Sequence, residues 1–363
     1  MPNRIILLLL VCCLISSESA VVQALPSEIN QSAQLIVKSS PEAAYQSQVA
    51  VPSKLIKMLF KGVTMKTNEY PVSDTYLEIT QKPYIVDPSC NLYDIRRAEL
   101  IMPPNHVKKL LEKYVSALRI THYGKMMTWE EGKRFLYLKS IFTVTDLQTG
   151  LHFQVQRRAG STHADVQPLT KRDTEVMKQI YGGKWSWKRK AILVIKNGQT
   201  VAASMHGMPH GGDGIPDNGF RGHFCIHFLG SSTHGTGQVD RDHQVMVHKA
   251  AGSLLPYVQR SSPFQMVDLY FTAINQKDPE IVSALFQHRR HAAFYVRRDI
   301  SPIIAIRRTS DYVEKDMSDM LAADIPIRAD VFSAGSKKSA VWVFQLRRNA
   351  LWQPWRMETI EMK

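Results

Sequence analysis

The sequence predicts an α+β protein with three successive regions, of which the central one is rich in β-strands. Strand-like alternation with hairpin turn signals is concentrated between residues 140 and 228, and isolated helical periodicities lie on both sides of it. A capped helix after residue 262 is followed by alternating runs, which predicts a helix and a curved antiparallel sheet in a cone-like domain. The chain has 363 residues, 44% of them hydrophobic, which suffices for several buried cores.

Residues 1–24 have the anatomy of a secretory signal peptide. Arg4 precedes an apolar run over 5–15, and small and polar residues lead to an acceptable cleavage site at residues 22–24. The run is too short for a comfortable bilayer span, so we expect a secreted, extracytoplasmic protein without a stable transmembrane segment. The alternative is a lipoprotein acylated at Cys12 or Cys13, although Leu10-Val11 lacks the small residue expected before such a cysteine.

The chain is basic, with a net charge of +14. Loss of residues 1–24 removes one cation, Arg4, and one anion, Glu18, so the charge does not change. This charge suits peptidoglycan or another anionic wall polymer, with simple solubility as the alternative. No basic motif with interleaved aromatic residues indicates a nucleic-acid partner. Cys90 and Cys225 remain after cleavage, and export permits a disulfide between them as the alternative to two free thiols.

Two segments precede the central region. Residues 25–50 are rich in Ser, Gln and Ala, and their composition predicts a mobile leader. Residues 51–125 mix strand-like runs with one helix, which follows Pro103-Pro104-Asn105 and has apolar residues at helical spacing up to Leu118. We therefore expect an N-terminal mixed α/β region over 51–125.

The central region is predicted to span 126–258. Hairpins are expected at 141–156 and at 191–204, the second around Asn197-Gly198. A helix opens at Thr170 with a capping box, and another opens at Asp240 and ends near Gly252. In the last region, 262–363, Ser262 caps a helix and strands are expected at 325–333, 340–347 and 354–361.

The heptad GHFCIHF, residues 222–228, places reactive side chains on one face of a predicted strand. His223, Cys225 and His227 alternate with Phe224, Ile226 and Phe228, which we expect to enter a core. A thiol is mostly protonated at neutral pH, and an imidazole within hydrogen-bond reach can take its proton. The pattern therefore predicts a nucleophilic cysteine assisted by His206 or His223.

The spacing around this heptad resembles that of the L,D-transpeptidase (YkuD) family. His206-Gly207, a loop of fifteen residues from 207 to 221 and then His223, Cys225 and Ile226 match the family signature, and the resemblance covers about residues 135–255. The chain departs from the signature at Gly222, Phe224 and His227, where the family has Ser or Thr, Gly, and Arg or Asn. The resemblance implies a small β-rich catalytic domain.

The resemblance also implies a reaction on peptidoglycan peptide stems. Cys225 would attack a stem carbonyl, release the terminal D-amino acid and pass the acyl group to an amine or to water. In this interpretation His206 and His223 are the catalytic histidines, with His210 as a second candidate for the first one. Candidate substrate-binding residues are Gly207, His210, His227, Arg158 and Trp187.

The cysteine mechanism needs no cofactor, and the alternative interpretation is a zinc enzyme. His163 and Asp165 form a His-x-Asp pair, and with His223 and His227 they could bind the Zn²⁺ of a peptidoglycan peptidase, with Cys225 as an extra ligand. The established spacings of zinc enzymes, such as His-Glu-x-x-His, are not present. A non-catalytic wall-binding relative is the third possibility left open by the sequence.

Overall fold

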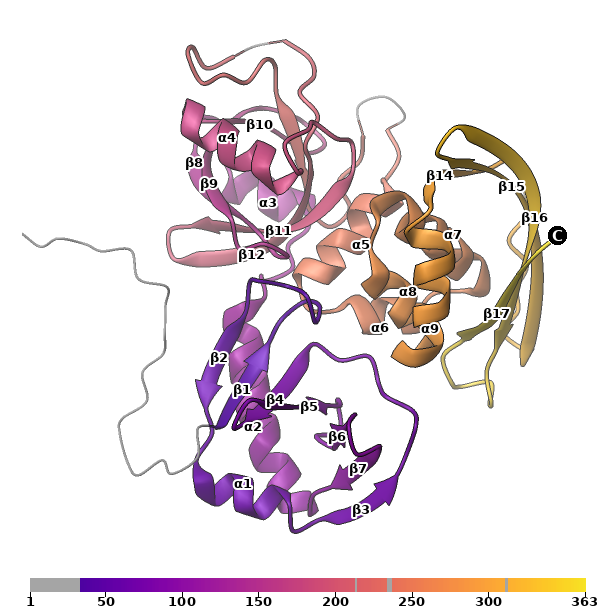
Figure 1. The fold of residues 1–363 in the computed structure, drawn as a ribbon. Coiled ribbons are helices and arrows are strands. Elements are labelled where there is room, and N and C mark those ends of the chain that lie inside the picture. The colour runs from indigo at the N-terminus through magenta and orange to yellow at the C-terminus, as the bar shows by residue number, and fades with distance from the viewer. Residues whose placement is uncertain (1–32, 213, 234–236, 311–312) are drawn as a thin grey trace, which may run out of the picture.

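The computed structural model describes residues 33–212, 214–233, 237–310 and 313–363 and contains three sheets joined by a group of helices (Figure 1). The predicted α+β class is confirmed, with strands in all three parts of the chain. The predicted signal peptide, its predicted cleavage site and Cys12 and Cys13 lie outside the described residues. Among the described residues, no helix combines the length and the apolar character that a bilayer crossing needs.

The N-terminal part is a seven-stranded sheet with the order β2-β1-β4-β5-β6-β7-β3. Its elements are β1 Ala33–Val37, β2 Ser47–Ala50, α1 Ser53–Leu59, β3 Val63–Lys66, β4 Thr75–Ile79, β5 Lys82–Val86, β6 Leu92–Asp94, β7 Glu99–Met102 and α2 Asn105–His122. The expected leader over 25–50 is corrected from residue 33 onward, because β1 pairs with both β2 and β4 inside this sheet. Leu35 and Val37 of β1 are fully buried, which a mobile segment would not allow.

The central part is a closed six-stranded barrel with the order β10-β13-β12-β11-β8-β9. Its elements are α3 Trp129–Phe135, β8 Ile141–Asp146, β9 His152–Ala159, β10 Ala164–Pro168, α4 Lys171–Ile180, β11 Arg189–Lys196, β12 Gln199–His206 and β13 Phe224–His227. Both predicted hairpins are present, as β8–β9 and β11–β12. Thr170 caps α4 through a capping box with Asp173, as the sequence predicts.

Helices connect the barrel to the last sheet. They are α5 Arg241–Ala250, α6 Leu254–Gln259, α7 Pro263–Gln276, α8 Pro279–Phe286, α9 Arg289–Tyr295 and a π-helical turn, Val296–Ile300. Asp240 and Ser262 cap α5 and α7 as predicted. The sheet that follows has the order β14-β15-β16-β17, with β14 Ile303–Arg308, β15 Ala322–Ser333, β16 Ser336–Arg347 and β17 Arg356–Met362, and β14 was not expected from the sequence.

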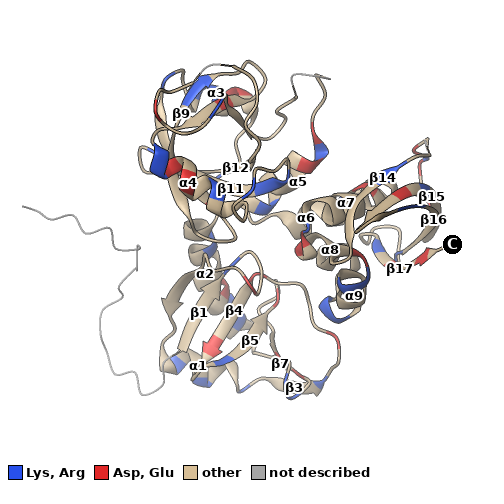
Figure 2. Ribbon diagram, turned by 45° about the horizontal axis from the view of Figure 1, so that its top comes forward, with Lys and Arg blue, Asp and Glu red and all other residues tan. Residues whose placement is uncertain are grey.

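Two large apolar cores hold these parts together. One fills the barrel and includes Phe153, Phe224 and Ile226. The other runs from the N-terminal sheet through α5 and α7 to the C-terminal sheet, where Trp342 and Phe344 pack on α7. The terminal regions, predicted as separate, therefore share one core. Lys and Arg occur in all three parts, for example on α1, β9 and α9, and do not gather on one of them (Figure 2).

Candidate functional site

The heptad 222–228 forms part of the barrel wall, with alternate residues on its two faces. Phe224 and Ile226 of β13 point into the barrel core and are fully buried, so the alternating residues Cys225 and His227 point outward. β13 is shorter than the predicted strand, and His223 precedes it. Cys225 is nevertheless only 4% exposed, because neighbouring histidines cover the outer face.

Strand register sets the neighbours of the thiol. β10 and β13 are antiparallel with Asp165 directly opposite Cys225, and the Cys225 Sγ atom lies 3.8 Å from Asp165 Oδ1. The same carboxylate oxygen lies 3.2 Å from His163 Nε2 and 3.7 Å from His223 Nε2. One carboxylate therefore connects the thiol with two imidazoles. Burial, and then the charge of Asp165, raise the pKa of the Cys225 thiol.

His210 makes the closest contact between an imidazole and the thiol. Its Nε2 atom lies 3.4 Å from Cys225 Sγ, and its Nδ1 atom lies 3.0 Å from the carbonyl oxygen of Met208. A carbonyl oxygen only accepts hydrogen bonds, so Nδ1 carries the proton and the lone pair of Nε2 faces the thiol. Burial lowers the pKa of His210, which keeps this imidazole neutral.

Two glycines allow the loop to bring His210 to this position. His210 and His223 exchange two backbone hydrogen bonds, of 3.0 and 2.8 Å, in an antiparallel bridge. Gly222 has a φ of +83°, and a Cβ atom there would lie 2.3 Å from the His210 carbonyl oxygen. A Cβ atom on Gly211 would lie 2.4 Å from Cε1 of His223. Only glycine fits this close approach.

His206, the preferred first histidine of the sequence analysis, contacts His210 instead of making the closest contact with the thiol. Its Nδ1 atom accepts a hydrogen bond of 3.3 Å from the Met208 amide, and its ring centroid lies 5.2 Å from that of His210. A nitrogen of each of His206 and His210 and Cys225 Sγ lie within 4.8 Å of one another. The structure therefore brings the predicted catalytic residues together, but the imidazole that lies closest to the Cys225 thiol is that of His210, the second candidate for the first histidine.

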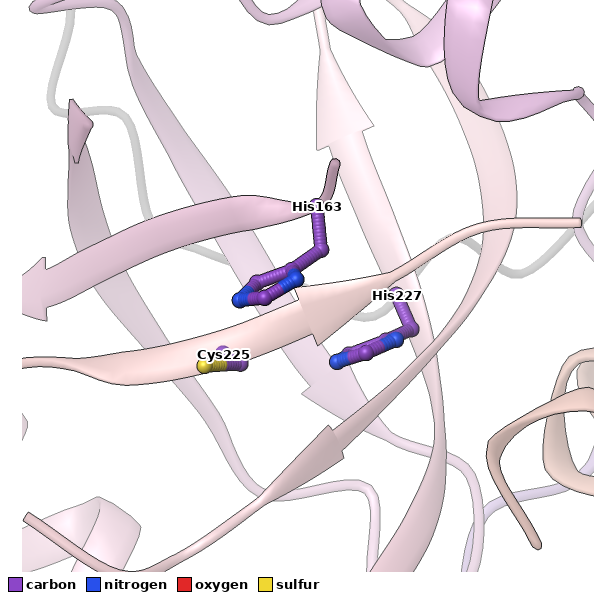
Figure 3. A group of neighbouring side chains, drawn as sticks. All are labelled: His163, Cys225 and His227. Atoms are coloured by element: carbon purple, nitrogen blue, oxygen red, sulfur yellow. The ribbon is translucent and has the colours of Figure 1, made fainter. Parts of the chain in front are cut away.

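Three buried imidazoles form a stack behind the thiol. The His227 ring is nearly parallel to the rings of His163 and His243, with centroid distances of 4.5 and 3.7 Å (Figure 3 shows the first pair with Cys225). Ser204 Oγ lies 2.9 Å from His243 Nδ1. Burial lowers the pKa of His227 and His243 well below the ordinary value, with the neighbouring histidines adding to the effect, so both rings are neutral.

His243 is not among the site residues predicted from the sequence, since it lies in the first turn of the helix predicted to open at Asp240. The available signal was its place on α5: His243, Val247 and Ala250 follow the i, i+4, i+7 spacing of one buried helix face. That face packs on β11 and β12 of the barrel. A histidine on this helix face therefore contacts residues of the barrel wall, here Ser204 and His227.

Of the predicted substrate-binding residues, Trp187 lies beside the histidines, and Gly207 and Arg158 make other contacts. Trp187 is half exposed, and its ring centroid lies 4.7 Å from His206 and 5.3 Å from His210, at the side where His210 and His223 are partly exposed. Gly207 lies against Tyr181, whose ring would be 2.4 Å from a Cβ atom on it. Arg158 lies on β9 where the β9–β10 register shifts, and its Nη1 donates to Gln156 Oε1 at 2.7 Å.

The predicted zinc ligands surround Cys225, but they belong to two different sets: His163 and His227 in one, Asp165 and His223 in the other. Three overlapping sets have ligand atoms that all lie within 4.8 Å of one another: His163, Cys225 and His227; His206, His210 and Cys225; Asp165, His223 and Cys225. Of the two alternatives for the cysteines, the Cys90–Cys225 disulfide is not formed, since both cysteines are free. Cys90 is buried near α2, and burial raises its pKa to about 11.

A scan against protein-family models found no family that matches this chain, and a search of curated proteins found no matching relative.

Proposed function

We propose that this protein is an exported, wall-associated enzyme that transfers or hydrolyses acyl groups of peptidoglycan peptide stems through a thioester on Cys225. One observation carries the proposal: Cys225 Sγ lies 3.4 Å from His210 Nε2, while the Met208 carbonyl, which accepts from Nδ1, leaves Nε2 free to accept the thiol proton. A nucleophile, a base within reach and a third group that orients the base are the parts that acyl transfer needs.

The reaction balances with these groups alone. Sγ bonds to the stem carbonyl carbon while the thiol proton passes to His210 Nε2. The bond to the terminal D-amino acid then breaks, and the leaving nitrogen takes that proton, which leaves a thioester on Cys225. An amine or water attacks the thioester and gives its proton to His210, which returns it to the departing sulfur.

Two features support a wall peptide as substrate. The His206-Gly207 to Cys225 spacing resembles the L,D-transpeptidase signature, and the net charge of +14 favours an anionic polymer as the surface on which the enzyme works. The half-exposed indole of Trp187, beside His206 and His210, offers an apolar surface at the approach to the thiol.

The test compares the two cysteines of the described chain. Full-length protein is incubated with disaccharide-tetrapeptide stems, and released D-alanine and the mass of the intact protein are measured. We expect Cys225→Ala to lower turnover at least about 10³-fold and to abolish the acyl adduct. Cys90→Ala, which removes a buried thiol outside the site, serves as the matched control. Turnover that survives in Cys225→Ala would contradict the proposal.

A further inference from the structure

The outer barrel face holds more ligating groups than a thiol–imidazole pair uses. Six imidazoles, one thiol and one carboxylate lie in contact there: His163, His206, His210, His223, His227, His243, Cys225 and Asp165. Proton transfer to and from the thiol needs only His210 among them. His227 in particular needs a reason, because among the described residues its buried Nδ1 atom has no hydrogen-bond partner, and burying a polar atom without one is costly.

One of the three ligand sets is buried at all three of its residues. His163, Cys225 and His227 are 1%, 4% and 2% exposed. Cys225 and His227 are two residues apart on β13 and so share one face, while His163 immediately precedes β10, the strand paired with β13. Cys225 and His227 thus lie on one strand of the closed barrel, and His163 lies at the start of the neighbouring strand (Figure 3). Such positions favour a fixed coordination geometry.

Neighbouring groups fix the orientation of the two rings. His163 Nδ1 lies 2.7 Å from the Ser232 carbonyl oxygen, which can only accept, so the lone pair of His163 is on Nε2. The His227 ring is held between His163 and His243, and its buried Nδ1 atom has no hydrogen-bond partner within the part of the chain that the structure describes. A ligating histidine oriented by a backbone carbonyl is the usual support of a metal site.

We infer that His163, Cys225 and His227 bind a Zn²⁺-class metal ion whose occupancy withdraws Cys225 from catalysis. One thiolate and two neutral imidazoles are borderline-soft donors that suit Zn²⁺ or Co²⁺ and exclude Mg²⁺ and Ca²⁺, which prefer oxygen. Asp165 Oδ1, 3.2 Å from His163 Nε2, is the adjacent oxygen donor. The regulatory half of the inference rests on the proposed function, whereas metal binding stands without it.

The exchange balances without a redox step. The S–H bond of Cys225 breaks, a bond from Sγ to the metal forms, and the proton leaves to solvent. A sulfur held by the metal no longer offers a proton to His210 or an electron pair to a carbonyl. A chelator that removes the metal restores the thiol and with it the acyl transfer. The ion is therefore a reversible inhibitor that competes with the substrate carbonyl for one atom.

Metal binding is measured on the full chain, first stripped with a chelator, by titration with Co²⁺ and Zn²⁺. We expect one equivalent to bind with a thiolate-to-cobalt charge-transfer absorption that is lost in Cys225→Ser. His227→Gln is expected to weaken Zn²⁺ binding about 100-fold, whereas His210→Gln leaves it within about threefold. His152→Gln, on an exposed β9 position, is the matched control. Zn²⁺ is expected to slow alkylation of Cys225 and not that of Cys90.

Several results would overturn the inference. Absence of Co²⁺ binding, a bound Co²⁺ without the thiolate band, or equal loss of binding in His210→Gln and His227→Gln removes the assigned ligand set. Activity on stems that rises with stoichiometric Zn²⁺ removes the inhibitory role and, with it, the nucleophile. Turnover that depends on Cys225 and is unchanged by Zn²⁺ removes the inference and leaves the proposed function standing.

Discussion

Asp165 and Cys225 face each other across the β10–β13 strand pair, and the carboxylate also reaches His163 and His223. Antiparallel pairing fixes this relationship, because directly opposite residues share one face of a sheet. The thiol is therefore positioned by the barrel wall, whereas its closest imidazole, His210, comes from the loop that joins β12 to β13. The wall and the loop can be tested separately.

The first prediction concerns which histidine takes the proton. We expect His210→Gln to lower the rate of D-alanine release from tetrapeptide stems about 10²–10⁴-fold, because it removes the base whose Nε2 faces the thiol. His206→Gln, the matched change at the residue favoured by sequence spacing, is expected to lower the rate about tenfold or less. A larger loss in His206→Gln than in His210→Gln would assign the base to His206.

The second prediction concerns the glycine that permits the His210–His223 bridge. In Gly222→Ala a Cβ atom would lie 2.3 Å from the His210 carbonyl at a φ of +83°, so the bridge has to open. We expect a loss of about 1–3 kcal/mol in the free energy of unfolding in urea, and a loss of activity larger than this destabilisation explains. Gly212→Ala, which would meet nothing within 4 Å, is the control. Unchanged activity in Gly222→Ala would mean that the bridge does not position His210.

The third prediction concerns acid stability and lies outside the site. His122 at the end of α2 is fully buried between Tyr45 and Tyr123, and Ser47 Oγ lies 3.1 Å from its Nδ1. Burial lowers the pKa of His122 to about 4, with Asp74 raising it and Arg119 lowering it to smaller extents. Well above pH 6.5 the ring is neutral in both the folded and the unfolded chain, so it causes no pH dependence there.

As the pH falls from 6.5 to 4, the unfolded chain binds a proton at His122 that the folded chain does not bind. The free energy of unfolding therefore falls, by roughly 3 kcal/mol once the pH reaches about 4. Urea unfolding at pH 7 and pH 4.5 should show a smaller acid loss in His122→Gln than in the wild type. His248, whose pKa burial also lowers to about 4, acts in the same direction in both proteins and cancels in this difference. Equal acid losses would contradict the prediction.

Local signals in the sequence were sufficient for the helices and hairpins. Thr170, Asp240 and Ser262 each cap a helix through hydrogen bonds to residues two or three positions on, so the sequence contains both partners within a few residues. Asn197-Gly198 likewise specifies the β11–β12 turn by itself. The strand alternation around Cys225 was predictable for the same reason.

Features that depend on distant partners were not predictable. Ala33–Val37 lies in a segment rich in Ser, Gln and Ala, and it forms a strand by pairing with both β2 and β4. The preference for His210 over His206 depends on how the loop 207–221 folds back, which spacing alone does not reveal. His243 reaches the site only because α5 packs on the barrel.

The single core shared by the N-terminal and C-terminal sheets has a consequence for how the chain acquires its structure. Arg119 Nη2 donates to the Gly252 carbonyl at 2.6 Å, and Arg289 Nη2 donates to that of Ser73 at 3.2 Å, so early and late segments are also joined by polar contacts. A chain that emerges amino end first has α1 and α2 to pack with the first sheet, but the rest of the shared core, from α5 to the C-terminal sheet, arrives only with the last third of the chain. The barrel encloses a core of its own, so it is the part that we expect to fold before the C-terminal third is available.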